Sequence, residues 1–296
     1  MTWLNAALQG ILLGGEYALV ACGLSLTFGV MRLVNLAHGD FAVCGAYLAL
    51  VLSASLGMPA WYTLPLLLPI AFAAGVALHL AVLSRSLRGG VLAPVLVTFG
   101  LSVVIENLLL EGASANTRSL DGGALSLASI EIGDHIVISW LRLTGLLVAL
   151  LVLGGLQALL TYTSWGRSVR ATSDDLDTAR LVGVRVRPVF ATVAGVAVAT
   201  AALAGVFLGL ISAFDPLAGG TVLIFAFEAV VIGGLGSLWG TLVGGVALGL
   251  TQQLVGQWNS QYAVLAVHVL FLVVLAVRPQ GMFAAASSPV ALPGTE

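Results

Sequence analysis

Nine apolar segments, most of them long enough to cross a lipid bilayer as a helix, account for most of this chain. A spanning helix needs about 20 mostly apolar residues. The segments run over residues 4–30, 41–56, 61–83, 91–110, 141–162, 189–212, 217–234, 238–256 and 262–277. Only 8% of the 296 residues are charged, whereas a soluble domain carries about 25%. We therefore expect an all-α polytopic membrane protein that forms a single transmembrane domain over residues 1–296.

The number of complete spans is eight or nine. The segment 41–56 is short, and the segment 217–234 contains Glu228 and ends in Gly233-Gly234. Either one can form a broken or re-entrant helix, because irregular backbone is tolerated at membrane depth where protein surrounds it. The N-terminus has neither the basic region nor the cleavage site of a secretory signal, so we expect the first apolar segment to be retained as a span.

Arginine positions predict the orientation of these spans. All eleven basic residues are Arg, and nine of them lie in or beside connections that fall on one side of the membrane. The nine are Arg32, Arg85, Arg88, Arg167, Arg170, Arg180, Arg185, Arg187 and Arg278. Arg118 and Arg142 fall on the other side. Because positive charge is retained in the cytoplasm during insertion, we expect a bacterial inner-membrane protein with a periplasmic N-terminus and a cytoplasmic C-terminus.

This topology assigns each long connection to one side. Residues 111–140 form a periplasmic loop, in which the partial alternation from Ile130 to Ile138 around Gly133-Asp134 predicts a β-hairpin. Residues 163–188 form a cytoplasmic loop that holds five of the eleven arginines. Residues 279–296 form a cytoplasmic tail.

Small residues indicate how the spans pack. Gly236, Gly240 and Gly244 follow one another at intervals of four residues. Helices in lipid associate by close approach of their backbones, which glycine permits, so we expect a compact bundle. Cys22 and Cys44 lie in apolar segments without a Cys/His cluster, and we interpret them as packing residues rather than metal ligands.

The cytoplasmic loop encodes a short amphipathic helix over residues 173–183. Ser173 is a good N-cap, the acidic residues that follow suit the positive end of the helix dipole, and Gly183 suits the C′ position. Leu176, Ala179 and Gly183 share one face by their spacing. Two interpretations are open: a connector held against lipid headgroups by its arginines, or a helix that fits into a groove of another protein.

Several segments resemble known permeases. Asp177 to Gly183 has the spacing of the EAAxxxG coupling motif of ABC-importer permeases, although its first two positions depart from that pattern. Other segments resemble the LivH-type permeases of the branched-chain (hydrophobic) amino acid ABC transporter family. These are Gly14-Gly15-Glu16-Tyr17-Ala18-Leu19, Phe28 to Asp40 with its Asn35-Leu36-Ala37-His38-Gly39, Gly233 to Gly240 and Arg278 to Phe283. The resemblance runs in order over essentially the whole chain.

The resemblance implies a permease that works with a second homologous permease subunit, two cytoplasmic ATP-binding subunits and a periplasmic solute-binding protein. Its ATPase-coupling residues would be Asp174, Asp175, Leu176, Asp177, Ala179, Arg180 and Gly183. The chain has no Gly-x4-Gly-Lys-Ser/Thr phosphate loop, so the partner subunits would bind ATP and Mg²⁺. This chain would then be no enzyme, and no nucleic-acid partner is expected.

We expect such a subunit to move branched-chain or other hydrophobic amino acids, or small amide-like solutes, by ATPase-driven alternating access. The alternative is a stand-alone secondary transporter or channel for small polar solutes, which would need an inverted internal repeat with paired broken helices. An intramembrane enzyme would need a Ser/His or paired-Asp constellation, and Ser212 and Ser237 have no His at a recognisable spacing.

Ionisable residues inside the spans mark a candidate translocation path. Charged groups are unfavourable in a bilayer core and usually face a cavity or a partner. Glu16 and Glu228 either line the path, giving it a preference for cations or amides, or are protonated carboxyls bonded to a neighbouring helix. Tyr17, Asn35 and His38 complete the predicted path.

Structural interpretations are also open for the histidines in the apolar part of the chain. His38 and Asp40 lie on either side of Gly39 and form either a cytoplasmic gate or a structural turn. His79 and His268 are isolated in apolar segments, and we interpret both as packing histidines whose hydrogen bonds are satisfied.

Overall fold

The computed structural model describes residues 2–90, 92–132 and 136–283 and confirms an all-α membrane fold. Its long helices are α1 (Thr2–Met31), α2 (His38–Leu56), α3 (Leu64–Leu78), α5 (Leu92–Ala113), α7 (Trp140–Tyr162), α10 (Val186–Ile211), α11 (Ala218–Gly233), α12 (Leu238–Trp258) and α13 (Ala263–Val277). Its shorter elements are η1 (Ala60–Thr63), the π-helix η2 (His79–Leu83), α4 (Ser84–Ser86), η3 (Leu87–Gly89), α6 (Ala124–Leu127), β1 (Ser129–Ile132), β2 (Ile136–Ser139), α8 (Ser164–Asp174), α9 (Leu176–Leu181) and η4 (Ser260–Tyr262).

The described chain has eight helical segments that are long and apolar enough to cross a membrane. One of them runs from η1 through α3 and η2 to α4, over residues 60–86. α11 is apolar but has only 16 residues. At 1.5 Å per residue it is about 24 Å long, which is shorter than the roughly 30 Å hydrocarbon core. By length, the described chain therefore has eight full spans and one shorter helix.

α2 is short because it begins inside the bundle. The segment between α1 and α2 is not helical, yet Leu33, Asn35 and Ala37 are buried. The His38 ring nitrogen Nε2 lies 2.9 Å from the carbonyl oxygen of Val20, in the middle of α1. The Leu36 amide donates to the hydroxyl of Thr98 in α5 at 3.2 Å. This irregular backbone is thus surrounded by protein, as membrane depth requires.

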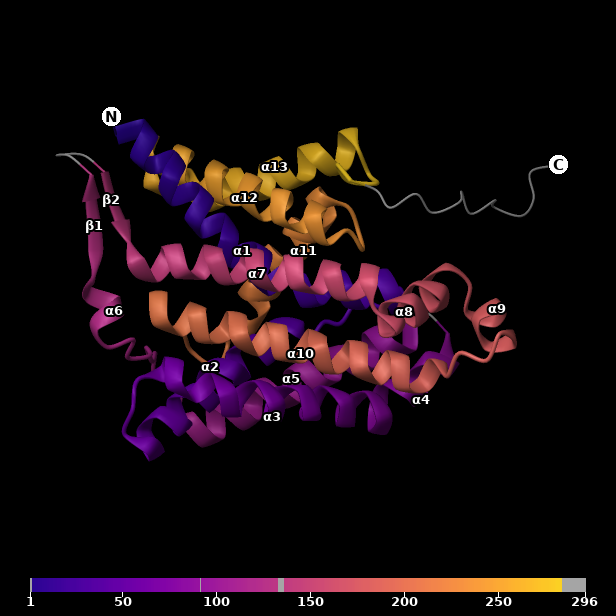
Figure 1. Ribbon diagram of the computed structural model, residues 1–296. Helices are drawn as coiled ribbons and strands as arrows, with labels where there is room; N and C mark the ends of the chain where they lie inside the picture. The colour runs from indigo at the N-terminus through magenta and orange to yellow at the C-terminus, as the bar shows by residue number, and fades with distance from the viewer. Residues whose placement is uncertain (1, 91, 133–135, 284–296) are drawn as a thin grey trace.

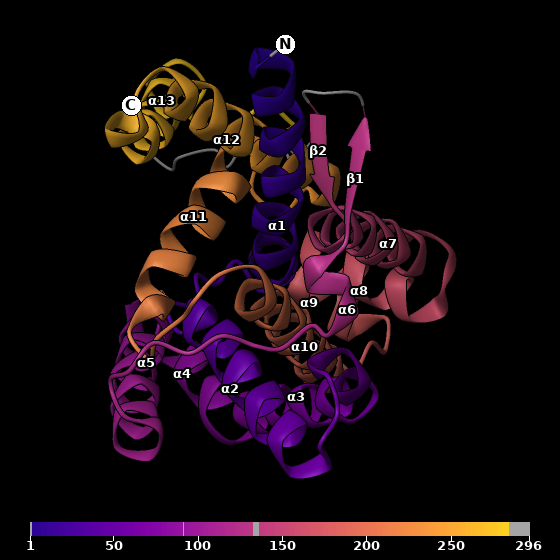
Figure 2. The same ribbon diagram turned by 90° about the vertical axis from the view of Figure 1, so that its left-hand side faces the viewer.

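The interior of the bundle is formed mainly by α1 and α10 (Figure 2). These two spans are the most buried of the eight, at 72% and 78% of their apolar windows, while α5 and α13 are the least, at 11% and 6%. Small residues allow α1, α2 and α10 to pack closely. An added methyl group on Gly205 in α10 would overlap the carbonyl of Ala42 in α2.

Glycines also bring α1, α11 and α12 into backbone contact. A methyl group on Gly10 would come within 2.7 Å of the Leu250 Cα in α12, and one on Gly249 would come within 2.5 Å of the Gly14 nitrogen. Gly240 faces the Gly233 carbonyl and Gly244 faces the Ala229 carbonyl, both in α11. Gly236 lies against Gly29 near the end of α1. The predicted packing glycines Gly236, Gly240 and Gly244 all stand at such close approaches.

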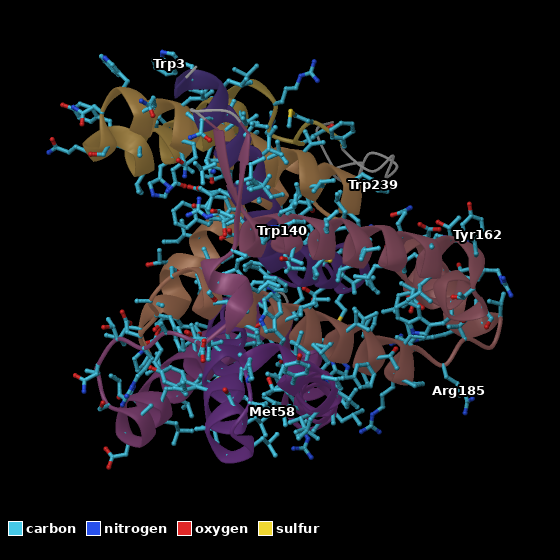
Figure 3. The ribbon with its side chains drawn as sticks, turned by 60° about the vertical axis from the view of Figure 1, so that its left-hand side comes forward. Trp3, Met58, Trp140, Tyr162, Arg185 and Trp239 are labelled. Atoms are coloured by element: carbon cyan, nitrogen blue, oxygen red, sulfur yellow. The ribbon has the colours of Figure 1, made fainter. Side chains whose placement is uncertain are left out.

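Exposed aromatic residues lie toward both ends of the bundle. Trp3 and Trp140 lie toward the hairpin end, whereas Tyr162 and Trp239 lie toward the end that carries α8 and α9, where Arg185 is also found (Figure 3). All four aromatic side chains are exposed. Aromatic residues gather where a membrane meets water. α7 joins two of these positions with 23 residues, about 34 Å of helix.

The Arg-bearing connections meet at the α8–α9 end. α4 and α8 both lie there (Figure 1), and the hydroxyl of Ser173 in α8 donates to the carbonyl of Gly29 near the end of α1 at 2.6 Å. The segment after α13, which begins with Arg278, contacts the end of α11: the Met282 amide donates to the carbonyl of Ile232 at 2.9 Å. The opposite end carries the antiparallel hairpin, which pairs Ile130 with Ile138. The strands agree with the prediction, while the Gly133-Asp134 turn and the tail from residue 284 lie outside the described residues.

Replacement of Gly240 by Ala should destabilise the bundle. The new methyl group would collide with the Gly233 carbonyl, and overpacking of this kind costs about 1–3 kcal/mol. Thermal unfolding of the purified protein in detergent measures the loss. Gly154→Ala in α7 is the matched control, because nothing lies within 4 Å of its added methyl group. Equal melting temperatures for the two variants would contradict the packing role of Gly240.

Candidate translocation cavity and coupling surface

A cavity of about 330 Å³ lies among α1, α7, α10, α11 and α12. Arg142 near the start of α7, Ser212 after the end of α10 and Gln252 in the second half of α12 all line it, so it lies toward the hairpin end of the bundle. Its volume falls in the range of small-molecule sites. Its walls are mostly apolar. They are formed chiefly by Leu13, Leu19, Val20, Ala204, Phe207, Leu208, Ile211, Val222 and Phe225.

Glu16 is one of the residues that line this cavity. Its atom Oε1 is enclosed and has no hydrogen-bond partner among the described residues. Beside Glu16, α1 approaches α7 closely: a methyl group on Gly15 would lie 2.7 Å from the Leu146 side chain. Glu16 therefore stands on a cavity wall, and its place in a translocation path stays a prediction.

Arg142 is held beside the cavity by neighbours from two other elements. Its Nη1 donates to the Gln9 side chain of α1 at 3.0 Å, and the Gln9 amide donates to the carbonyl of Val137 in β2 at 2.7 Å. The Arg142 guanidinium has five N–H donors, and among the described residues only the Gln9 side chain accepts a hydrogen bond from it. From the sequence, Arg142 entered only the count of arginines on each side of the membrane. Its position near Glu16 could not be predicted, because the two residues are far apart in the chain.

Tyr17 forms one wall of the cavity and separates it from a second polar group. Its hydroxyl donates to the Gln252 side chain, and its ring stacks on Phe225 with centroids 4.8 Å apart. Phe225 also stacks on His268, at 5.8 Å. The His268 Nδ1 lies 2.5 Å from the Oε1 of Glu228. The sequence revealed neither Gln252 nor this continuous stack.

Glu228 therefore lies behind the cavity wall and does not line the cavity. Its side chain is buried and bonded to His268 of a neighbouring helix, which is the arrangement of the second interpretation from the sequence. The interpretation of His268 as a packing histidine with satisfied hydrogen bonds agrees with the structure, because its ring stacks on Phe225 and its Nδ1 bonds to a carboxyl group 40 positions away. His79 packs as expected, with its ring against Phe190 at 6.0 Å, but its buried Nδ1 has no hydrogen-bond partner among the described residues, so it is not satisfied in the way the sequence predicted.

Asn35 and His38 also lie away from the cavity. The Asn35 Oδ1 accepts a hydrogen bond from the Ala37 amide at 3.1 Å, which forms the turn that leads into α2. His38 is completely buried beside α1. Of the five predicted path residues, the structure brings Glu16 and Tyr17 together and places the other three in structural contacts. Among the described residues, no three His, Cys, Asp or Glu side chains are grouped as a metal site requires.

The loop at 163–188 forms two helices, so the expected single helix over 173–183 is wrong. α8 ends at Asp174 and α9 begins at Leu176. The N-cap of α9 is Asp175, whose Oδ1 accepts from the amides of Asp177 at 2.9 Å and Thr178 at 3.1 Å. Hydrogen bonds from Thr178 and Asp177 hold the pKa of the Asp175 carboxyl below its ordinary value. The predicted cap, Ser173, is engaged with Gly29.

The end of α9 agrees with the prediction. Gly183 has φ +87°, and the Val184 amide donates to the Ala179 carbonyl at 3.0 Å, as at a left-handed helix terminus. Arg180 and Asp177 form an exposed ion pair at 3.2 Å, which contributes little stability.

The exposed face of α9 differs from the one expected. Ala179 is buried against this chain, so the set Leu176, Ala179 and Gly183 cannot be presented together to another protein. The apolar side chains that point outward are Leu181, 87% exposed, and Val182, 72% exposed. The outward face of α9 is therefore set by the packing of Ala179 against this chain.

Comparison with known proteins agrees with this architecture. Residues 6–277 match the family described as the permease component of the branched-chain amino acid transport system. The chain belongs to this family. It is 29% identical to the high-affinity branched-chain amino acid transport system permease protein BraD of Pseudomonas aeruginosa, over 95% of each chain.

This chain also resembles two Escherichia coli proteins that are both named as permeases of the high-affinity branched-chain amino acid transport system. LivH is 28% identical over 95% of each chain, and LivM is 27% identical over 90% of this chain and 67% of its own. No solved structure matches the sequence. The chain is therefore a permease component of a transport system and a multi-pass membrane protein.

Removal of one partner of the Glu228–His268 pair should destabilise the protein more than removal of both. His268→Phe leaves the buried Glu228 carboxyl without its hydrogen bond, and an orphaned buried polar group costs about 1–3 kcal/mol. Glu228→Leu combined with His268→Phe removes that penalty. Melting temperatures of both single variants and the double variant in detergent give the coupling energy. Additive losses would show that the pair does not contribute as a unit.

Proposed function

We propose that this chain is the transmembrane permease subunit of an ABC importer for branched-chain and related hydrophobic amino acids. It works with a second homologous permease, two cytoplasmic subunits that bind ATP and Mg²⁺, and a periplasmic solute-binding protein. One observation carries the proposal. A cavity of the size of a small solute lies toward one end of the bundle, and two exposed apolar residues, Leu181 and Val182, lie at the arginine-rich end. The two E. coli relatives, LivH and LivM, support a pair of homologous permeases.

In the proposed orientation, the cavity end faces the periplasm and the α8–α9 end faces the cytoplasm. The arginine distribution supports this, because nine of eleven arginines belong to or adjoin the connections of one side. A solute released by a binding protein would enter beside the hairpin and Arg142. The proposed path runs along Glu16 and Tyr17, with Asn35 and His38 fixing the buried start of α2 and Glu228 supporting the wall from behind.

The coupling surface in this proposal is α9 with the residues on either side of it, including the predicted set Asp174, Asp175, Leu176, Asp177, Ala179, Arg180 and Gly183. Leu181 and Val182 would insert into a groove of an ATP-binding subunit, because exposed apolar residues on a capped helix suit recognition by a partner's groove. Asp175 and Gly183 define the ends of α9, and Ala179 anchors it to this chain.

A stand-alone transporter or channel is the alternative, and partner association separates the two. Leu181→Asp should weaken association with the ATP-binding subunits roughly 10-fold or more, as expected for a buried apolar anchor. Copurification from cells that co-express the neighbouring transport genes measures it. Met58→Asp, also an exposed apolar residue but near the other end of the bundle (Figure 3), is the control. ATP-independent uptake by this chain alone in proteoliposomes would contradict the proposal.

The orientation has a direct test of its own. In a background with Cys22→Ala and Cys44→Ala, a cysteine at Val182 should react with a membrane-impermeant maleimide only in inverted vesicles. A cysteine at Arg118, which is exposed at the hairpin end, should react only in intact spheroplasts. The reverse pattern would place α9 on the periplasmic side and rule out ATPase coupling through it.

A further inference from the structure

We infer that the cavity binds the zwitterionic backbone of a free α-amino acid, with Glu16 taking the ammonium group and Arg142 the carboxylate. The inference rests on the proposed function and assigns the two residues of its cavity that bind the charged groups of the solute. Both residues line the same space of about 330 Å³. They lie on different helices, α1 and α7, so the separation of the two charges is set by helix packing and not by a flexible loop.

Glu16 has a vacant acceptor. Its Oε1 is enclosed and unpartnered, and no cationic group of the described chain lies within 4.0 Å of the carboxylate. A buried polar group without a partner is unfavourable. A ligand ammonium provides N–H donors and the opposite charge, and bonds between charged partners are the strong ones.

Arg142 is prepared for the other end of such a ligand. One guanidinium nitrogen is fixed by Gln9, which is itself fixed by β2. The guanidinium therefore has a defined position, with N–H donors left for a planar carboxylate, the group that Arg binds best. Glu16 and Arg142 are not paired with each other, so each is available to a ligand.

The rest of the cavity suits an aliphatic side chain. Leu19, Val20, Ala204 and Phe207 give it an apolar wall, and the stacked rings of Tyr17 and Phe225 close another side. A solute with one positive group, one negative group and an apolar remainder matches all three parts. A fatty acid or an amine would satisfy only one of the two charges, and a neutral sugar would satisfy neither.

The test measures binding to the assembled importer in nanodiscs, without the binding protein, so that this cavity and not the binding protein is probed. The probe is radiolabelled L-leucine. Competitors are 4-methylpentanoate, which is leucine without its ammonium, and 3-methylbutylamine, which is leucine without its carboxylate. In the native complex both should bind roughly 10-fold or more weakly than leucine, because each lacks one bond between charged partners.

Two near-isosteric variants should then give opposite patterns. Glu16→Gln should weaken leucine binding roughly 10-fold or more and leave 4-methylpentanoate unchanged, since that compound never contacted the carboxylate. Arg142→Gln should weaken leucine similarly and leave 3-methylbutylamine unchanged. Glu16→Asp and Arg142→Lys keep the charges and should retain the discrimination. Glu106→Gln in α5 and Arg118→Gln, neither of which lines the cavity, should bind all three compounds normally.

Three results would overturn the inference. Leucine binding that is unchanged in Glu16→Gln or Arg142→Gln is the first. An equal loss for all three compounds is the second, because it indicates a structural defect. The third is displacement of leucine by D-fructose as effectively as by leucine itself. ATP-dependent uptake by the native complex is measured separately: uptake with a failed binding pattern refutes only the zwitterion site, whereas absent ATP-dependent uptake refutes the importer.

Discussion

Close backbone contact between α1 and α12 is the constraint on which the rest of the molecule depends. Gly10 and Gly14 meet Gly249 and Gly245 with no side chain between them. Since lipid provides no hydrophobic drive to bring helices together, such contact is what holds them. The same two helices are also joined by the Tyr17 hydroxyl, which donates to the Gln252 side chain. One wall of the cavity therefore depends on the contact between α1 and α12.

Glu16 and Glu228, two carboxyl groups within this bundle, have different surroundings. Glu228 is buried away from the cavity, and its Oε1 bonds to His268, whose ring stacks on Phe225, while its Oε2 has no hydrogen-bond partner among the described residues. Glu16 faces a cavity with one oxygen unpartnered. Ionisable groups in a membrane are retained where they pair or where they serve a pathway, and this chain contains one of each. The stacked rings of Tyr17 and Phe225 separate the two environments.

The sequence predicts what depends on local pattern and misses what depends on distant partners. The spans, the hairpin strands and the left-handed Gly183 follow from apolar runs, alternation and a lone glycine. The start of α9 does not, because Ser173 and Asp175 are equally good caps in sequence and the Gly29 carbonyl in α1 engages Ser173. The role of Arg142 and the pairing of His268 with Glu228 are equally invisible, because their partners lie more than 35 residues away.

α1 connects the two functional ends of the proposed importer. Near its C-terminal end, the Gly29 carbonyl accepts a hydrogen bond from Ser173 of α8, and Gly29 itself packs on Gly236 before α12. Thirteen residues earlier on the same helix, Glu16 lines the cavity, about 20 Å away along the axis. A displacement of the α8–α9 element would therefore act on a rigid helix whose other half carries a cavity wall. Because α12 is bound to α1 along its length, the wall residues Tyr17 and Gln252 would move together, and the cavity would change shape at its boundaries with α7, α10 and α11.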